Sequence, residues 1–117
     1  MWKAQSLSFR LRINPNDAQT HFNLGSLLGT KGDWEGAIAE YRAALRIDPD
    51  LAQTHGNLGF ALGEKGDVEG AIAEYQAALR IIPNDAQMHG YLGFTLGEKG
   101  DVEGAIAEYQ TALGISQ

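Results

Sequence analysis

The sequence predicts an all-α fold in which short helical repeats stack into a solenoid. Three observations lead to this prediction. Several residue types recur at one fixed interval along the chain, each interval contains two stretches with helical periodicity, and a Gly-Asp pair separates the two stretches. A fixed period of this length is typical of repeat architectures, so the helices are expected to pair and the pairs to stack.

Four residue types recur every 34 residues. They are proline, histidine, glycine and tyrosine, at Pro15, Pro49 and Pro83; His21, His55 and His89; Gly32, Gly66 and Gly100; and Tyr41, Tyr75 and Tyr109. We therefore divide the single domain 1–117 into an N-terminal helix and linker (1–17) and three repeats (18–51, 52–85 and 86–117). Repeats two and three differ at 7 of 32 aligned positions, as a recent duplication or consensus engineering would produce.

The first stretch of each repeat has the pattern of an amphipathic helix. Within 52–65, His55, Leu58 and Leu62 fall at i, i+3 and i+7 on one helical face. Gly66 suits the left-handed residue that ends such a helix. At its start we expect a capping box, in which a side chain caps the helix and a glutamine follows three residues later. The predicted boxes are Asn16/Gln19, Asp50/Gln53 and Asn84/Gln87.

The second stretch predicts a helix over 68–81. Asp67 suits its N-cap, and Pro83 prevents the helix from continuing. Small residues at fixed positions predict close packing, with glycines such as Gly59 letting backbones approach and Tyr75 supplying bulk. Residues 1–17 have the register of the same helix type, because Leu7, Leu11 and Ile13 correspond to Tyr75, Leu79 and Ile81.

These motifs resemble those of the tetratricopeptide repeat family. The second repeat reads Leu58-Gly59, Leu62, Gly66-Asp67, Ala71, Tyr75, Ala78 and Pro83, and the other repeats match it in register except for a missing final proline in the third. The resemblance implies a right-handed α-solenoid of three helix-turn-helix repeats plus an N-terminal half-repeat helix. It also implies a scaffold for protein-protein interaction and not an enzyme. The three histidines stand where the family often has tryptophan.

In this family the first helices line the concave side, where ligands usually lie. Helical spacing then selects the expected groove residues: Gln19, Phe22, Asn23, Ser26, Gln53, Asn57, Phe60, Glu64, Gln87, Tyr91, Phe94 and Glu98. Helical glycines, including Gly56 and Gly90, flank Phe60 and Phe94. They indicate either room for a partner's side chains, or close approach of a neighbouring helix, or tolerated copies of a duplicated residue.

The charge of the expected groove favours some partners over others. Glu64 and Glu98 favour a neutral or basic peptide or helical segment. The positions at which some family members hold a C-terminal carboxylate contain no lysine or arginine here, so such a tail would lose its hydration without gaining a counter-ion. The net charge of −6 makes nucleic acid an unfavourable partner.

The two ends of the array suggest a second function. Both ends are expected to present the same helix type with apolar residues, namely Trp2, Phe9, Ile106, Tyr109, Leu113 and Ile115. End-to-end contact would give a homodimer or a self-assembling structural module. A third possibility is that the chain is a fragment of a larger multidomain protein.

Several other classes of site are not expected. There is no cysteine, and equivalent histidines in neighbouring repeats would be about 10 Å apart, too far to share a metal. We interpret the histidines as packed residues with one nitrogen in contact with water. No catalytic residues and no cofactor are predicted. No apolar run approaches the roughly 20 residues of a membrane helix, and no signal peptide is evident, so the default location is the cytoplasm.

Overall fold

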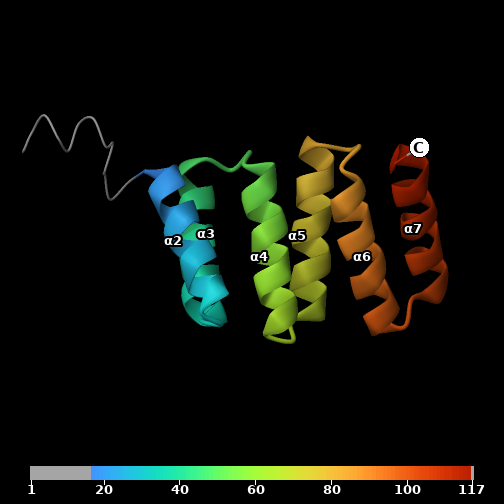
Figure 1. The fold of residues 1–117 in the computed structure, drawn as a ribbon, viewed down its shortest axis with the longest axis horizontal. Helices are drawn as coiled ribbons and strands as arrows, with labels where there is room; N and C mark the ends of the chain where they lie inside the picture. Colours follow the sequence, from blue (N-terminus) through green and yellow to red (C-terminus); the bar gives the residue numbers. More distant parts are fainter. Residues whose placement is uncertain (1–16, 117) are drawn as a thin grey trace, which may run out of the picture.

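The computed structural model describes residues 17–116, and its helices confirm the all-α prediction. Figure 1 shows the helices side by side in sequence order. Their bounds are α2 (Ala18–Thr30), α3 (Trp34–Ile47), α4 (Ala52–Glu64), α5 (Val68–Ile81), α6 (Ala86–Lys99) and α7 (Val102–Ser116). They form three helical hairpins, α2/α3, α4/α5 and α6/α7, and neighbouring hairpins pack through α3 and α4 and through α5 and α6.

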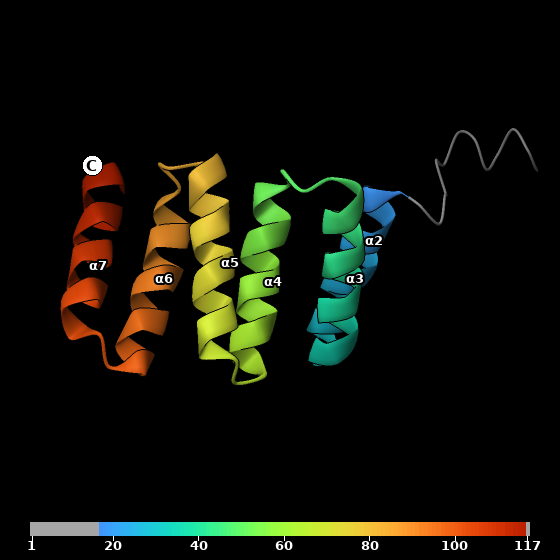
Figure 2. The ribbon, with the colours of Figure 1, turned by 180° about the vertical axis from the view of Figure 1, so that it is seen from behind.

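The hairpins stack into an α-solenoid that is tighter on one side. The first helices of neighbouring hairpins also touch, α2 with α4 and α4 with α6, whereas α3, α5 and α7 do not touch one another within residues 17–116. The array therefore bends toward its first helices. α2 and α7 lie at opposite ends of the array, as the two views in Figures 1 and 2 show.

The turn inside each hairpin forms as predicted. Gly32, Gly66 and Gly100 have φ of +81°, +90° and +96°, a backbone region that glycine enters without steric cost. The aspartate that follows caps the next helix: Oδ1 of Asp67 accepts a hydrogen bond from Gly70 N at 2.9 Å. The same bond recurs at 2.9 Å in the other hairpins, at Asp33 and Asp101.

The predicted caps of the first helices are wrong by one residue. Pro83 and Asn84 form the turn itself, so the extended residue that precedes α6 is Asp85, whose carboxylate accepts from Met88 N. The equivalent residue before α2 is Asp17, which accepts from Gln19 N. Before α4 it is Leu51, which has no side-chain oxygen, so α4 begins without a side-chain cap.

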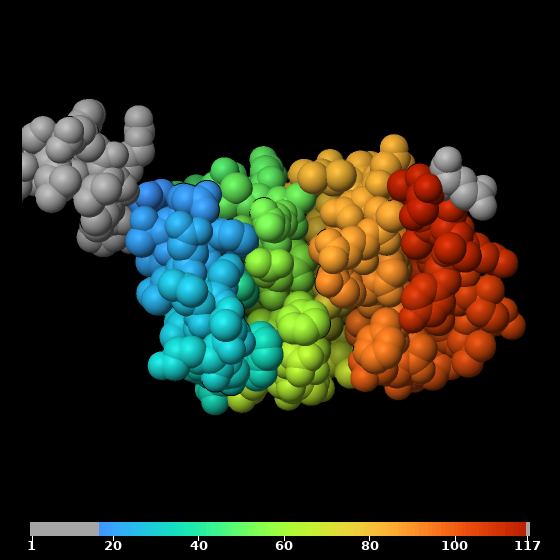
Figure 3. Space-filling view, viewed as in Figure 1, coloured from blue at the N-terminus to red at the C-terminus, as the bar shows by residue number. Residues whose placement is uncertain are grey.

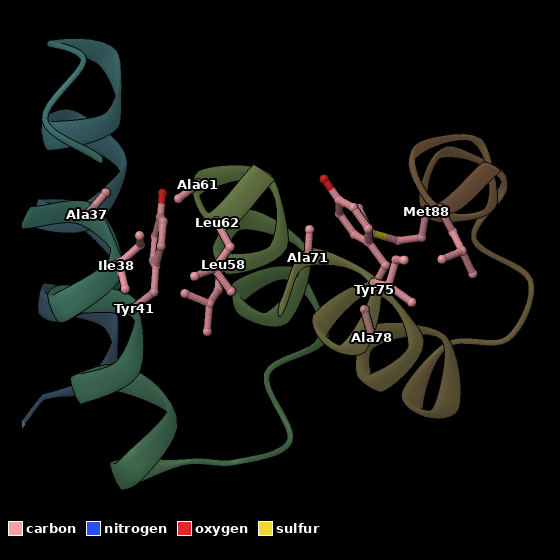
Figure 4. Packing of buried hydrophobic residues seen from close by; sticks show 12 residues of the cluster. Ala37, Ile38, Tyr41, Leu58, Ala61, Leu62, Ala71, Tyr75, Ala78 and Met88 are labelled. Atoms are coloured by element: carbon pink, nitrogen blue, oxygen red, sulfur yellow. The ribbon is translucent and has the colours of Figure 1, made fainter. Parts of the chain in front are cut away.

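One apolar core runs through the stack. Figure 4 shows it between the ribbons of α3, α4, α5 and α6. Its buried members are Ala37, Ile38, Tyr41, Leu58, Ala61, Leu62, Ala71, Ile72, Tyr75, Ala78, Met88 and Leu92. A Cβ added at Gly59 would lie 2.9 Å from the Tyr75 ring and 3.2 Å from the Ala71 carbonyl oxygen. The prediction that this glycine permits close helix approach is therefore confirmed.

The outer faces of the two end helices are less covered than the middle of the stack. On α7, Ile106 and Tyr109 are exposed, although the equivalent residues of α5, Ile72 and Tyr75, are buried beneath α6. Leu113 of α7 is 65 % exposed. The predicted half-repeat helix, with Trp2 and Phe9, lies outside the described residues. Among the helices of residues 17–116, none combines the length and the apolar character that crossing a membrane requires.

Candidate binding groove

Four aromatic side chains form a row across the three hairpins. The ring centroids of Trp34 and Phe60 are 5.7 Å apart in an edge-to-face arrangement, and those of Phe60 and Tyr91 are 6.2 Å apart. Tyr91 stacks on Tyr75 with centroids 5.8 Å apart. The four rings come from α3, α4, α6 and α5, so the row exists only when the hairpins are stacked. We call these four residues the aromatic row.

Two hollows adjoin the aromatic row and share the side chains of Phe60 and Tyr91. The first hollow, of about 350 Å³, is lined by Ser26, Gly29, Thr30, Trp34, Tyr41, Gly56, Asn57, Phe60 and Tyr91. The second hollow, of about 510 Å³, is lined by Phe60, Gly63, Glu64, Tyr75, Tyr91, Phe94, Thr95 and Glu98. Figure 3 shows the stacked helices as one elongated, continuous surface.

The structure brings seven of the twelve predicted groove residues to these two hollows. They are Ser26, Asn57, Phe60, Glu64, Tyr91, Phe94 and Glu98. Gln19, Phe22 and Gln53 instead line a separate hollow that includes Ile81 and Ile82. Asn23 accepts a hydrogen bond from the Gln19 amide at 2.8 Å, and the Gln87 amide donates to the Tyr91 hydroxyl at 3.1 Å. The predicted stripe is thus divided between two regions.

Sequence reasoning missed the contribution of the second helices. Trp34, Tyr41 and Tyr75 lie on α3 and α5, and they supply walls to the hollows. The predicted groove residues come from the first helices only. One signal is present for Trp34, because the equivalent positions of the other repeats are the smaller Val68 and Val102.

The glycines near the aromatics do not act alike. A Cβ at Gly56 would lie 2.7 Å from Sδ of Met88, so the space beside this buried glycine is filled by α6. At this position close approach of a neighbouring helix explains the glycine, because its Cβ side faces α6, although Gly56 also lines the first hollow. A Cβ at Gly90 would have no atom of another helix of residues 17–116 within 4 Å, and a Cβ at Gly63 or Gly97 would meet only an alanine Cβ at 3.8 Å.

The second hollow is acidic as well as aromatic. Glu64 and Glu98 are exposed, and neither carboxylate has a hydrogen-bond or ion-pair partner among residues 17–116. The adjacent lysines are engaged elsewhere, Lys65 with Glu35 and Lys99 with Glu69, each at 3.1 Å.

Burial and the charges around the second hollow also change the pKa of Tyr75. Burial raises the pKa of the Tyr75 hydroxyl well above its usual range, and Tyr91, Glu64 and Glu98 raise it further. Tyr75 therefore stays neutral and offers a hydroxyl, while the carboxylates carry the charge of the hollow.

The interpretation that each histidine leaves one nitrogen to water is wrong for His55 and His89. Nδ1 of His55 lies 2.7 Å from Glu74 and Nε2 lies 2.8 Å from the Pro49 carbonyl oxygen. In the same way, Nδ1 of His89 lies 2.6 Å from the Glu108 carboxylate, and its Nε2 lies 2.8 Å from the Pro83 carbonyl oxygen. Because a carbonyl oxygen only accepts, Nε2 of each ring must donate, and at His89 the Glu108 carboxylate then favours a second proton at Nδ1.

These histidines are therefore structural links between a first helix, the preceding turn and the second helix of the same hairpin. Burial alone would lower the pKa of His89, but its bonds to Glu108 and the Pro83 carbonyl, with the charges of Glu108 and Asp85, raise it above its ordinary value. His21 also pairs with a glutamate, Glu40, at 2.6 Å. Within residues 17–116, no group of three or more His, Asp or Glu side chains could hold a metal ion.

Comparison with known proteins adds family and fold evidence. A family described as TPR repeat matches residues 30–66 and 62–100. A solved structure described as "Crystal structure of MamA" aligns with 96 % of this chain at a TM-score of 0.86 and 21 % identity. Another solved structure, described as "Crystal structure of MamA protein", aligns with 95 % of this chain at a TM-score of 0.83 and 22 % identity. No curated protein matches the chain.

The two MamA structures bear on the fold alone, since the identities are low. This chain spans 66 % of the length of the first MamA chain and 61 % of the second.

Proposed function

The chain belongs to the tetratricopeptide repeat family, and from that premise we propose that it is a scaffold that binds a peptide or helical segment of a partner protein in its concave groove. Members of this family generally serve as non-catalytic scaffolds for protein partners. The observation that supports the groove is the aromatic row with a hollow on each side of Phe60. Phe60 is 42 % exposed and Phe94 60 % exposed, and aromatics beside concave pockets are typical binding hot spots.

The arrangement fits a chain segment better than a compact small molecule. The two hollows share a wall, so successive side chains of one extended or helical segment could occupy both. Asn57 lines the first hollow and offers an amide that both donates and accepts, which suits the backbone of a bound segment. Ser26 adds a hydroxyl in the same hollow.

A pair of double variants tests the proposal. Phe60→Ala/Phe94→Ala should abolish capture of a partner in a pull-down while leaving the helical circular dichroism and the oligomeric state unchanged. Ile106→Ala/Leu113→Ala is the matched control, because it also removes two exposed apolar side chains but from α7. Equal capture by the first double variant and the wild type would contradict groove binding.

Self-association through the ends is the second candidate function. The observation that favours it is the exposed face of α7, where Ile106, Tyr109 and Leu113 lie without a covering helix among the described residues. We propose that Ile115, Trp2 and Phe9 would join this contact. Light scattering over a range of concentrations would show a rising mass that Ile106→Ala/Leu113→Ala lowers. A strict monomer at high concentration would exclude this candidate.

A further inference from the structure

We propose that the second hollow receives a basic side chain of the bound segment, for which arginine is the best match. This inference rests on the proposed function, and it specifies the chemistry of one contact within the groove. The cation would lie against the rings of Phe60, Tyr91 and Phe94, with its donors directed to Glu64 and Glu98.

Charge supports a cationic occupant. Glu64 and Glu98 are equivalent residues of neighbouring repeats, and both line this one hollow. Neither carboxylate is neutralised by a cation of residues 17–116, because Lys65 and Lys99 bind glutamates of the preceding hairpins. An apolar or acidic side chain entering here would lie beside two unpaired charges, whereas a basic one would pair with them.

The aromatic walls support the same occupant. A cation over the face of a phenylalanine or tyrosine ring is attracted to the π electrons, and the attraction grows as water is excluded. Guanidinium is planar and carries five donors in a rigid fork, so it can stack on a ring and bind two carboxylates together. An ammonium group is more strongly hydrated and fits this combination less well, so lysine is expected to bind more weakly.

The first hollow differs in a way that gives the groove a direction. Its lining contains no charged side chain among the described residues, and Trp34, Phe60 and Asn57 leave it apolar with polar edges. A bound segment would therefore place an apolar residue beside α2 and α3 and a basic residue beside α5 and α6. The two hollows share Phe60 and Tyr91, so these two residues of the segment should be close in its sequence.

Selection from a random peptide library displayed on phage tests this inference, because such a library offers every class of side chain to the groove. The wild-type chain is used as bait, and selected peptides are synthesised for affinity measurements. Glu64→Gln/Glu98→Gln removes the two charges of the hollow. Asp48→Asn/Glu103→Gln is the matched control, because it changes the net charge equally at two exposed carboxylates that do not line the hollow and form no ion pair with the described residues.

We expect the selected peptides to share a basic residue near an apolar one. Their affinity should fall about five- to tenfold for Glu64→Gln/Glu98→Gln and fall with added salt, as for partly exposed charge pairs, and should be unchanged for the control. Replacing the basic residue by norleucine in the peptide should cause at least the same loss of affinity, and that loss should shrink in the Glu64→Gln/Glu98→Gln background, where only the attraction of the cation to the rings remains.

Two failures would have different meanings. Peptides that require Phe60 but carry no basic residue, or that bind equally well after Glu64→Gln/Glu98→Gln, would overturn this inference and leave groove binding intact. Peptides that are insensitive to Phe60→Ala/Phe94→Ala would overturn groove binding itself, and the inference with it.

Discussion

A methyl group added at Gly59 would be forced against the interior of the stack. Its Cβ would lie 2.9 Å from Cε1 and 3.0 Å from Cδ1 of Tyr75, and 3.2 Å from the carbonyl oxygen of Ala71. Contacts between carbon atoms are normally about 3.5–4.0 Å. The Tyr75 ring is buried and stacks on Tyr91, so it cannot move aside without disturbing the aromatic row.

Two opposing effects determine how much Gly59→Ala changes the free energy of unfolding. Overpacking a well-filled core costs about 1–3 kcal/mol, and the upper half of this range applies because both ring and backbone are in the way. Alanine in place of a helical glycine returns about 1 kcal/mol. Gly59→Ala should therefore lower the free energy of unfolding by about 1–2 kcal/mol.

Gly90→Ala is the matched control, since it adds the same methyl group to the corresponding helix of the next repeat. Beside Gly90 there is open space within 4 Å, so only the helical preference of alanine acts, and the free energy of unfolding should rise by about 0.5–1 kcal/mol. The two variants should differ by about 2 kcal/mol, which is a separation of about 1 M in urea midpoint.

Urea unfolding followed by circular dichroism measures this difference, and an unchanged slope would show that the same surface is exposed in each variant. A Gly59→Ala protein as stable as the wild type would refute the reasoning, because it would mean that the tyrosine ring is free to shift. So would a Gly90→Ala protein that is less stable than the wild type.

Three further changes test other parts of the structure. Leu58→Ala removes a side chain that is 2 % exposed and should lower the free energy of unfolding by about 2–5 kcal/mol in urea titrations. A change well below this range would mean that the core is loosely packed around Leu58. Asp85→Ala removes the cap of α6 and should lower the free energy of unfolding by about 1 kcal/mol, whereas Asn84→Ala should change it by less than about 0.5 kcal/mol. A larger loss for Asn84→Ala than for Asp85→Ala would mean that Asn84 is the cap, as the sequence suggested. Because the pKa of His89 is raised on folding, its link to Glu108 stabilises fully below its ordinary pKa of about 6.5 and is lost as pH rises through the raised value. The difference in stability between wild type and Glu108→Gln should thus shrink as pH rises above about 6.5, and a constant difference would contradict the link.

The fold could be predicted because its determinants are local and repeated. Gly66 and Asp67 specify a left-handed residue and an N-cap next to each other, and the structure contains both. The caps of the first helices were harder to place, because a proline and the residue after it fit a helix start and a turn equally well. Only the folded backbone shows that Asn84 belongs to the turn.

The site could be predicted only in part, because it depends on how helices from different hairpins are rotated against one another. Phe60 and Phe94 can each be predicted from the helical spacing within its own helix, α4 or α6. Tyr75 enters the groove through a contact with Tyr91 of the next hairpin, which no local pattern encodes. The partner of His89 does have a signal in the sequence, because Glu108 also recurs at the repeat interval, with Glu40 and Glu74.

The differences between repeats explain why the aromatic row forms where it does. Gly56 of α4 leaves a space that Met88 of α6 fills, and this contact holds α6 against α4 beside the pair of Phe60 and Tyr91. At the preceding interface the sizes are exchanged: Phe22 of α2 stands where α4 has Gly56, and the small, buried Thr54 stands where α6 has Met88. By repeat position, a large residue thus corresponds to a small one at each interface, but in opposite orders, and Phe22 and Thr54 line one hollow. The hairpins are therefore not interchangeable, and the order of the repeats is part of what builds the groove.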